Sequence, residues 1–187
     1  RPYASYYANT EQKLGVAEGI GRVSKDQWKQ RASTLRFVQS GRRGLVKSVT
    51  SVNSAGELVP SRKLISFLDT DNDTEASVKV AHVEFRRDAD GKLLQVLAYN
   101  NQMHEQWAFH YTDPPTKGQY VDPNGYERSR TGSGAAHVEA IYNENGRIRQ
   151  LRYFDRRQRP QPDSNGVYGF RIERLAPHQR RIIYLGP

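Results

Sequence analysis

The sequence predicts an all-β protein, built mainly from antiparallel β-hairpin repeats that form a curved or barrel-like sheet after a short N-terminal helical segment. Two observations support this fold class. From about residue 33 onward, apolar and polar residues alternate with the period of two that is typical of half-buried strands. Short turns that carry glycine separate these segments and provide the positive φ that tight hairpins require. We therefore expect a single domain, with a helical or irregular segment at 1–32 and hairpin repeats at 33–187.

The N-terminal segment carries the helical signals of the chain. Ser24 and Gln27 have the spacing of a capping box, and Trp28 is placed to anchor a short helix at 25–31. Glycines at positions 15, 19 and 21 interrupt any longer helix. The tyrosines near the start of the chain are expected to pack onto the later sheet.

About four degenerate hairpin units follow, with turns at Gly44, Gly91, Gly146 and Pro177. Their unequal spacing argues against a uniform solenoid and favours one sheet with insertions. The insertions are expected at 69–75 and 111–136, and the second of these is rich in Pro, Gly, Asp and Ser, as surface loops are. The clearest strand predictions are 83–87, 92–99, 138–142, 147–154, 170–173 and 180–185.

Some of these units share the order aromatic, Asp or Asn, two residues, Gly, strand. Examples are Tyr142-Asn143-Glu144-Asn145-Gly146, which leads to Tyr153-Phe154-Asp155, and the final Tyr184-Leu185-Gly186-Pro187. This pattern resembles the tyrosine-aspartate-type hairpin repeats of large multidomain bacterial signalling and defence proteins, over residues 35–187. The resemblance implies a sensor or partner-binding segment beside a separate effector domain, and it brings no catalytic residues. The last unit departs from the pattern, because Pro177 stands where the other units have Gly.

Composition narrows the setting of the protein. There is no cysteine, which excludes disulfides and thiolate metal sites and fits a reducing compartment without proving one. We expect a cytoplasmic location, and we expect no cofactor. The sequence has no signal peptide and no apolar run near the roughly 18 residues of a membrane span, so no membrane contact is expected. Because the chain begins at Arg1, we expect it to be part of a longer protein.

The charge is concentrated at the C-terminal end. The chain has 29 basic and 20 acidic residues, and from Arg128 onward it holds 12 arginines, no lysine and five acidic residues. Arginine suits planar contacts with carboxylates, phosphates and aromatic rings. Two interpretations stay open: the arginines coat the solvent face of strands, or they bind an anionic partner.

The candidate binding site combines a loop and a hairpin of this basic region. Small residues at 131–136 let backbone N–H groups converge into a concavity that can hold an anion, although the ending of a phosphate-binding loop is missing. In the hairpin 138–155, we expect Ile148 and Phe154 to face the core and Tyr153 to be exposed beside two arginines. The candidate residues are Arg128, Arg130, Gly132, Ser133, Gly134, Arg147, Arg149 and Tyr153.

Other chemistry has weaker sequence support. Asp69–Glu75 has the acidic spacing that opens a calcium loop but lacks its Gly and its final Glu, which favours a solvated acidic loop. His104 and His110 are six residues apart, which is too far for two zinc ligands on one strand, and Trp107 and Phe109 are expected to face the core. No Gly-x-Ser-x-Gly nucleophile elbow is present.

The sequence therefore predicts a non-catalytic sensor or protein-recognition module that binds a protein partner through arginine and aromatic side chains. A nucleic-acid-binding domain is the alternative, with Tyr142, Tyr153, Phe154 and Tyr168 as stacking candidates. An enzyme or a carbohydrate-binding domain with an unrecognised site is the third possibility. The oligomeric state stays open.

Overall fold

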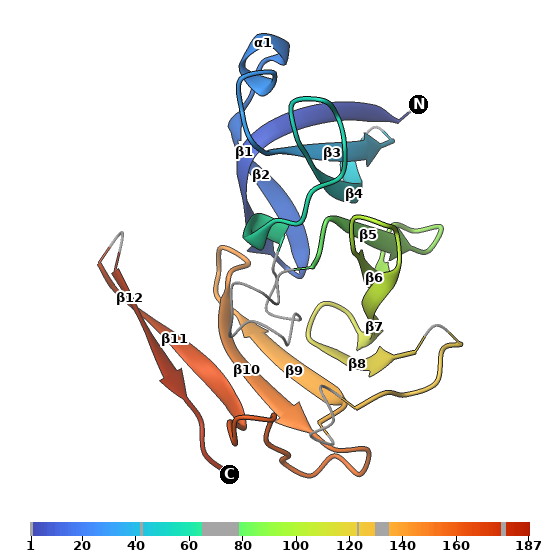
Figure 1. The fold of residues 1–187 in the computed structure, drawn as a ribbon. Coiled ribbons are helices and arrows are strands. Elements are labelled where there is room, and N and C mark those ends of the chain that lie inside the picture. The colour runs from blue at the N-terminus through green and yellow to red at the C-terminus, as the bar shows by residue number, and fades with distance from the viewer. Residues whose placement is uncertain (1, 42, 65–78, 123, 130–134, 177–178) are drawn as a thin grey trace. The chain divides into compact units, whose positions relative to one another are not determined.

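The protein is all-β, as predicted, in a computed structural model that describes every residue except 1, 42, 65–78, 123, 130–134 and 177–178. Twelve strands form one sheet in the order β12-β11-β10-β9-β8-β7-β6-β5-β4-β3-β1-β2 (Figure 1). Nearly every strand therefore pairs with its neighbour in sequence, as in a chain of hairpins. The order is linear and ends at β12 and β2, so the sheet is open and the barrel-like version of the prediction is wrong.

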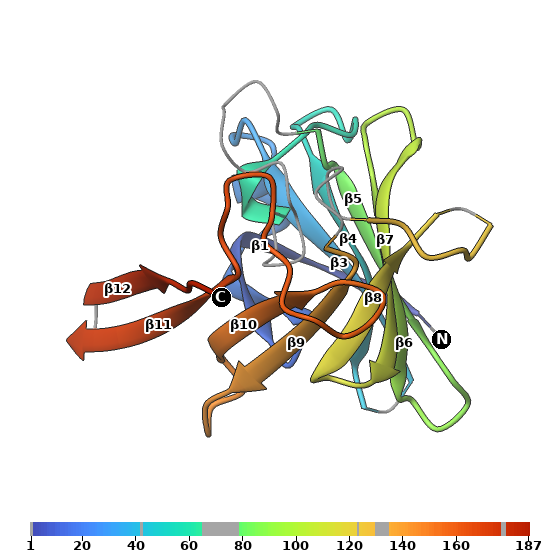
Figure 2. The ribbon, with the colours of Figure 1, turned by 90° about the horizontal axis from the view of Figure 1, so that it is seen from below.

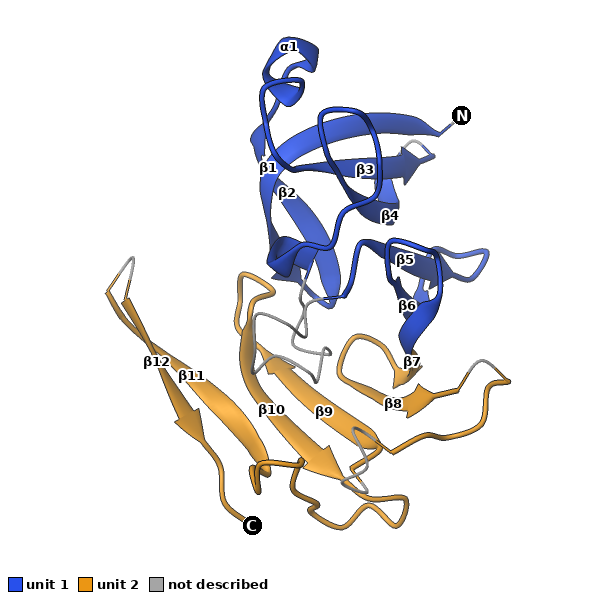
Figure 3. Ribbon diagram, viewed as in Figure 1, with its two compact units in different colours: residues 1–108 blue, residues 109–187 orange. Residues whose placement is uncertain are grey.

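The residues group into two compact units, unit 1 at 1–108 and unit 2 at 109–187 (Figure 3). Unit 1 contains β1 Tyr3–Lys13, β2 Val16–Arg22, α1 Lys25–Trp28, β3 Thr34–Ser40, β4 Leu45–Val52, the 3₁₀ turn η1 Arg62–Leu64, β5 His82–Arg87 and β6 Leu93–Tyr99. Strand β7, Glu105–Asp113, begins in unit 1 and continues into unit 2. Unit 2 then contains β8 Lys117–Val121, β9 His137–Tyr142, β10 Ile148–Phe154, β11 Gly169–Ala176 and β12 Gln179–Tyr184. A single cooperative domain stays a prediction.

The N-terminal segment is a β-hairpin, so the expected irregular structure before α1 is wrong. Gly19, taken from the sequence as a helix breaker, lies within β2 beneath the ring of Tyr7, which fills the space that its own side chain would occupy. The ring of Phe109 covers Gly118 of β8 in the same way. An aromatic ring that covers a glycine of a neighbouring strand compensates for the missing side chain. The expected insertion at 111–136 is wrong in its first part, because that part forms the end of β7 and all of β8.

The predicted helix is shorter than expected but has the expected cap. Ser24 accepts the backbone N–H of Gln27, whose side chain accepts the N–H of Ser24. Trp28 stacks on Tyr6 with ring centroids 5.1 Å apart, and its indole N–H donates to the carbonyl of Asn53 at 3.1 Å. These contacts anchor a helix of four residues that could not persist alone. The helix is far too short to cross a membrane, and the described residues contain no other α-helix.

The core of unit 1 follows the predicted alternation. Phe37, Val49 and Val83 lie opposite one another across β3, β4 and β5, and all three are buried. The next buried residue on the same face of β5 is Phe85, and Tyr7 meets Phe37 edge to face at 5.0 Å. Burying large side chains of this kind stabilises a fold by about 1.5–3 kcal/mol each.

One turn type recurs throughout both units. An Asp or Asn side-chain oxygen accepts the backbone N–H groups two and four residues later, and its own carbonyl accepts the N–H three residues later. That third residue has a positive φ and is Gly in all cases but two, where Met103 and Gln158 adopt φ of 61°. In the described part of the chain the turn occurs at Asn53, Asp88, Asn100, Asp122, Asn143, Asp155 and Asp163. The acidic or amide residue thus defines the repeat as much as the glycine does.

Candidate binding surface on the terminal hairpin

The predicted loop site falls partly outside the described residues. Four of its predicted residues lie outside the described part of the chain: Arg130, Gly132, Ser133 and Gly134. Arg128 is exposed, and its backbone N–H donates to the carbonyl of Tyr120 at 2.9 Å. Arg128 therefore stays a candidate contact residue.

The predicted exposed face of the β9–β10 hairpin is wrong at Tyr153. A bulge between Ile148 and Gln150 shifts the register, so the simple alternation assumed from the sequence fails there. Leu151 and Tyr153 consequently point to the core, with exposed fractions of 0% and 3%. Ile148, expected in the core, is only half-buried, as is Phe154.

The two arginines of that hairpin differ in exposure. Arg149 sits at the bulge and is exposed, whereas Arg147 is half-buried and donates its backbone N–H to the side chain of Asn143 at 2.9 Å. Arg149 stays a candidate contact residue, and Arg147 also has a role in closing its turn.

The buried face of unit 2 continues onto an exposed hairpin. Leu151 of β10 lies opposite Phe170 of β11, and Phe170 lies opposite Tyr184 of β12. Ile172 and Ile182 form the next pair on the same side. We call Phe170, Ile172, Ile182 and Tyr184 the apolar face. Exposure rises along it, from 0% at Leu151 to 45% at Ile182 and 69% at Tyr184.

The opposite face of the hairpin holds paired charges and is called here the charged face. Glu173 contacts Arg171 at 3.0 Å and Arg181 at 4.0 Å. Further along this side of the sheet, Lys117 contacts Glu139 at 3.1 Å. Here the arginines do coat a solvent face, which was one of the two interpretations of the basic region.

Two arginines lie at the end of the apolar face and have a different setting. Arg174 and Arg180 are directly opposite each other across β11 and β12, on the side of Ile172 and Ile182, and both are exposed. No carboxylate of the described residues pairs with either of them. Like charges directly opposite in an antiparallel pair destabilise it. This pair is therefore a site of unbalanced positive charge beside exposed apolar side chains.

The outer edge of β12 is the end of the sheet order (Figures 1 and 2). Leu185 directs both its N–H and its carbonyl toward β11, where they meet Gly169 and Tyr168 at 2.9 and 3.0 Å. Because consecutive residues of a strand turn their backbone groups to alternate sides, Ile183 and Arg181 also face β11. Arg180, Ile182 and Tyr184 consequently direct their N–H and carbonyl groups outward, away from β11.

A polar network in unit 1 was missed from the sequence. Nδ1 of His82 lies 2.7 Å from the Thr50 hydroxyl, and its Nε2 lies 3.5 Å from the Glu84 carboxylate, which Arg86 contacts at 3.3 Å. Burial lowers the pKa of His82, although Glu84 opposes that shift, so burial favours the neutral imidazole. Hydroxyl, imidazole and carboxylate also make up nucleophile triads, but Thr50 is only 2% exposed and cannot reach a substrate. The network thus links β4 to β5 within the sheet.

His137 of unit 2 corresponds to His82, because both are the second residue of the four-residue sequence Ala-His-Val-Glu. Its Nε2 lies 3.3 Å from the carboxylate of Glu127, and Arg156 holds that carboxylate at 3.0 Å. The short repeat thus places a histidine beside a glutamate twice, with a different glutamate in each unit. That repetition was a sequence signal for the two histidines, although Glu127 lies outside the repeated letters.

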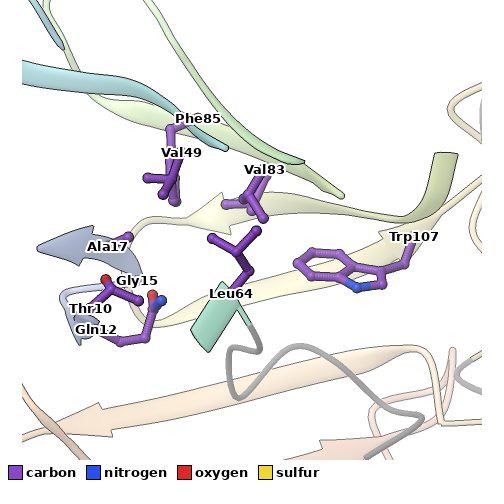
Figure 4. A pocket seen from close by; sticks show the side chains of 10 residues that line it. Thr10, Gln12, Gly15, Ala17, Val49, Leu64, Val83, Phe85 and Trp107 are labelled. Carbon is purple, nitrogen blue, oxygen red and sulfur yellow. The ribbon is translucent and has the colours of Figure 1, made fainter. Parts of the chain in front are cut away.

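The remaining candidates give no support to catalysis or metal binding. His104 and His110 are both exposed, and the buried Phe109 faces the core as predicted. The possible calcium segment 69–75 lies outside the described residues, which contain no cluster of three or more potential metal ligands. Figure 4 shows an apolar pocket of unit 1 that is lined without any acidic, basic or histidine side chain, by Thr10, Gln12, Gly15, Ala17, Val49, Leu64, Val83, Phe85, Val96 and Trp107.

No protein-family model, curated protein or solved structure matches the chain.

Proposed function

We propose that this chain is a non-catalytic recognition module that binds a protein partner through the apolar and arginine side chains of the β11–β12 hairpin. The observation that carries this proposal is the apolar face. It continues a buried face of the sheet onto a hairpin where Ile182 and Tyr184 are 45% and 69% exposed. Exposed apolar side chains that adjoin one another, bordered by charge, mark interaction sites.

The chemistry of the hairpin favours an anionic partner. Arg174 and Arg180 face each other without a carboxylate from the described residues, so an incoming carboxylate would remove their repulsion. Arginine and tyrosine are also the side chains that most often dominate protein–protein binding energy. The exposed Arg128 and Arg149 are further candidates for contacts with the partner.

The nucleic-acid alternative has less support from the same surface. Of the predicted stacking residues, Tyr153 is buried, and the Tyr142 hydroxyl donates to the carbonyl of Pro115 at 3.0 Å. Phe154 and Tyr168 are half-buried. Sequence-independent binding of single strands needs exposed rings beside a basic groove.

The proposal is tested by titrating the protein with a labelled acidic peptide whose central residues are Val-Thr-Val-Glu-Glu. The comparison probes are the same peptide with lysine for glutamate and a single-stranded oligonucleotide. We expect the acidic peptide to bind most tightly, and Arg174→Gln with Arg180→Gln to weaken it by about tenfold. The matched control is Arg152→Gln with Arg171→Gln on the charged face, where Arg152 lies opposite Glu139. It removes the same charge and should change the affinity less than about threefold.

Tighter binding of the oligonucleotide, with an affinity that falls steeply with salt, would overturn the proposal in favour of nucleic-acid binding. Equal losses of peptide affinity in the two double variants would show that net charge, and not the hairpin surface, attracts the peptide.

A further inference from the structure

We infer that the partner segment binds as an additional β-strand along the outer edge of β12. This inference rests on the proposed recognition function and specifies how the partner is held. The edge offers three consecutive outward-facing positions, at Arg180, Ile182 and Tyr184. Each presents a backbone N–H and a carbonyl that an extended chain can pair with.

The side chains at these three positions specify the partner. All three lie on the apolar face, since they are opposite Arg174, Ile172 and Phe170. A strand that pairs with β12 places every second side chain on this face. Its residues beside Tyr184 and Ile182 are therefore apolar, and its residue beside Arg180 is acidic.

The intervening positions of β12 define the other face. Ile183 is half-buried, and Arg181 is exposed. The guanidinium of Arg181 lies 4.0 Å from the carboxylate of Glu173, which is farther than that of Arg171 at 3.0 Å. A second acidic residue of the partner fits beside Arg181. The occupant is thus an extended segment in which apolar residues precede two acidic residues, when it runs antiparallel to β12 like the other pairs of the sheet.

Charge makes this edge selective. A strand with basic residues at its end would meet Arg174, Arg180 and Arg181, and a second copy of β12 would bring the same arginines to the interface. Like charges along an edge are a common means by which proteins prevent edge-to-edge pairing with themselves. An acidic partner converts that repulsion into attraction.

The experiment uses peptides methylated at chosen backbone nitrogens, so that the full protein remains unchanged. In Val-Thr-Val-Glu-Glu the N–H groups of the two valines face β12, whereas that of the threonine points away from it. We expect N-methylation of both valines to weaken binding by about tenfold or more, and N-methylation of threonine to change it by less than about twofold. Ile182→Pro, which removes an outward N–H of an edge strand together with the isoleucine side chain, is the matching change in the protein.

The outcomes separate the two proposals. If the valine-methylated peptide binds as tightly as the parent while Arg174→Gln with Arg180→Gln still weakens it, the surface recognises acidic proteins but strand addition is wrong. If neither change affects binding, the recognition function itself is wrong. Dimerisation of the free protein through β12, seen as a mass of two chains that Ile182→Pro restores to one, would show that a second copy is the occupant.

Discussion

A substitution at Asn143 tests how much the repeated turn contributes to the stability of the fold. Its side-chain oxygen accepts the backbone N–H groups of Asn145 at 3.0 Å and Arg147 at 2.9 Å. Asn143→Ala removes both interactions, and each such bond contributes about 0.5–1.5 kcal/mol net. Two such bonds together contribute about 1–3 kcal/mol. Because water can reach an exposed turn and replace the lost acceptor, we expect the free energy of unfolding to fall by the lower part of this range, about 1–2 kcal/mol.

The measurement is urea-induced unfolding of three variants at pH 7. For a chain of this length, the expected loss corresponds to a melting temperature about 2–8 °C lower. Asn143→Asp keeps the acceptor and should stay near the parent, and Glu144→Ala, an exposed neighbour in the same turn, should change stability by less than about 0.5 kcal/mol. If Asn143→Ala is as stable as Glu144→Ala, the side-chain oxygen does not hold the turn and the reasoning fails.

Three further predictions concern the backbone and pH. Gln158 adopts a left-handed φ of 61°, so Gln158→Gly should raise the free energy of unfolding by about 0.5–1 kcal/mol, and an unchanged urea midpoint would contradict this. An added Cβ at Gly169, where φ is 141°, would press on the carbonyl oxygen of Leu151 and lie 2.9 Å from Cα of Arg152. Gly169→Ala should therefore lower the free energy of unfolding by about 2 kcal/mol or more, and parental stability would count against the β10–β11 geometry. The folded-state pKa of His82 is lowered, so the unfolded state binds more protons and stability falls as the pH drops below about 6.5. His82→Gln should lose that part of the pH dependence between pH 7 and 5, and identical pH profiles would refute it.

The strand pattern beyond residue 33 was predictable because local alternation and turn chemistry act together. In β5 the alternating residues Val83 and Phe85 are buried and their neighbours are not, and seven turns of the described residues carry the Asp or Asn and the positive-φ residue that this turn type requires. The Asn143 turn needs no tertiary information to be recognised.

The errors arose where a distant residue decides the structure. Gly19 and Gly118 look like loop residues until the rings of Tyr7 and Phe109 are seen to cover them. Tyr153 was assigned to the wrong face because one extra residue at a bulge reverses the alternation. Neither contact nor bulge leaves a local signal in the sequence.

The apolar face was beyond sequence analysis for a similar reason. Phe170, Ile172 and Ile182 alternate as core residues do, and only the three-dimensional structure shows that the side they share ends uncovered at β12. The sequence predicted an anionic contact site within the arginine-rich region. The structure instead draws attention to Arg174 and Arg180, which were not among the candidates.

Hydrogen exchange at the β12 edge tests the recognition proposal most directly. In the free protein, the outward N–H groups of Ile182 and Tyr184 should exchange quickly, whereas that of Ile183, which faces β11, should be protected. Saturation with the Val-Thr-Val-Glu-Glu peptide should slow the amide exchange of Ile182 and Tyr184. It should leave the exchange rate of the charged-face residue Arg171 unchanged. Peptide binding without added protection at Ile182 and Tyr184, or protection of these two groups in the free protein, would contradict the account.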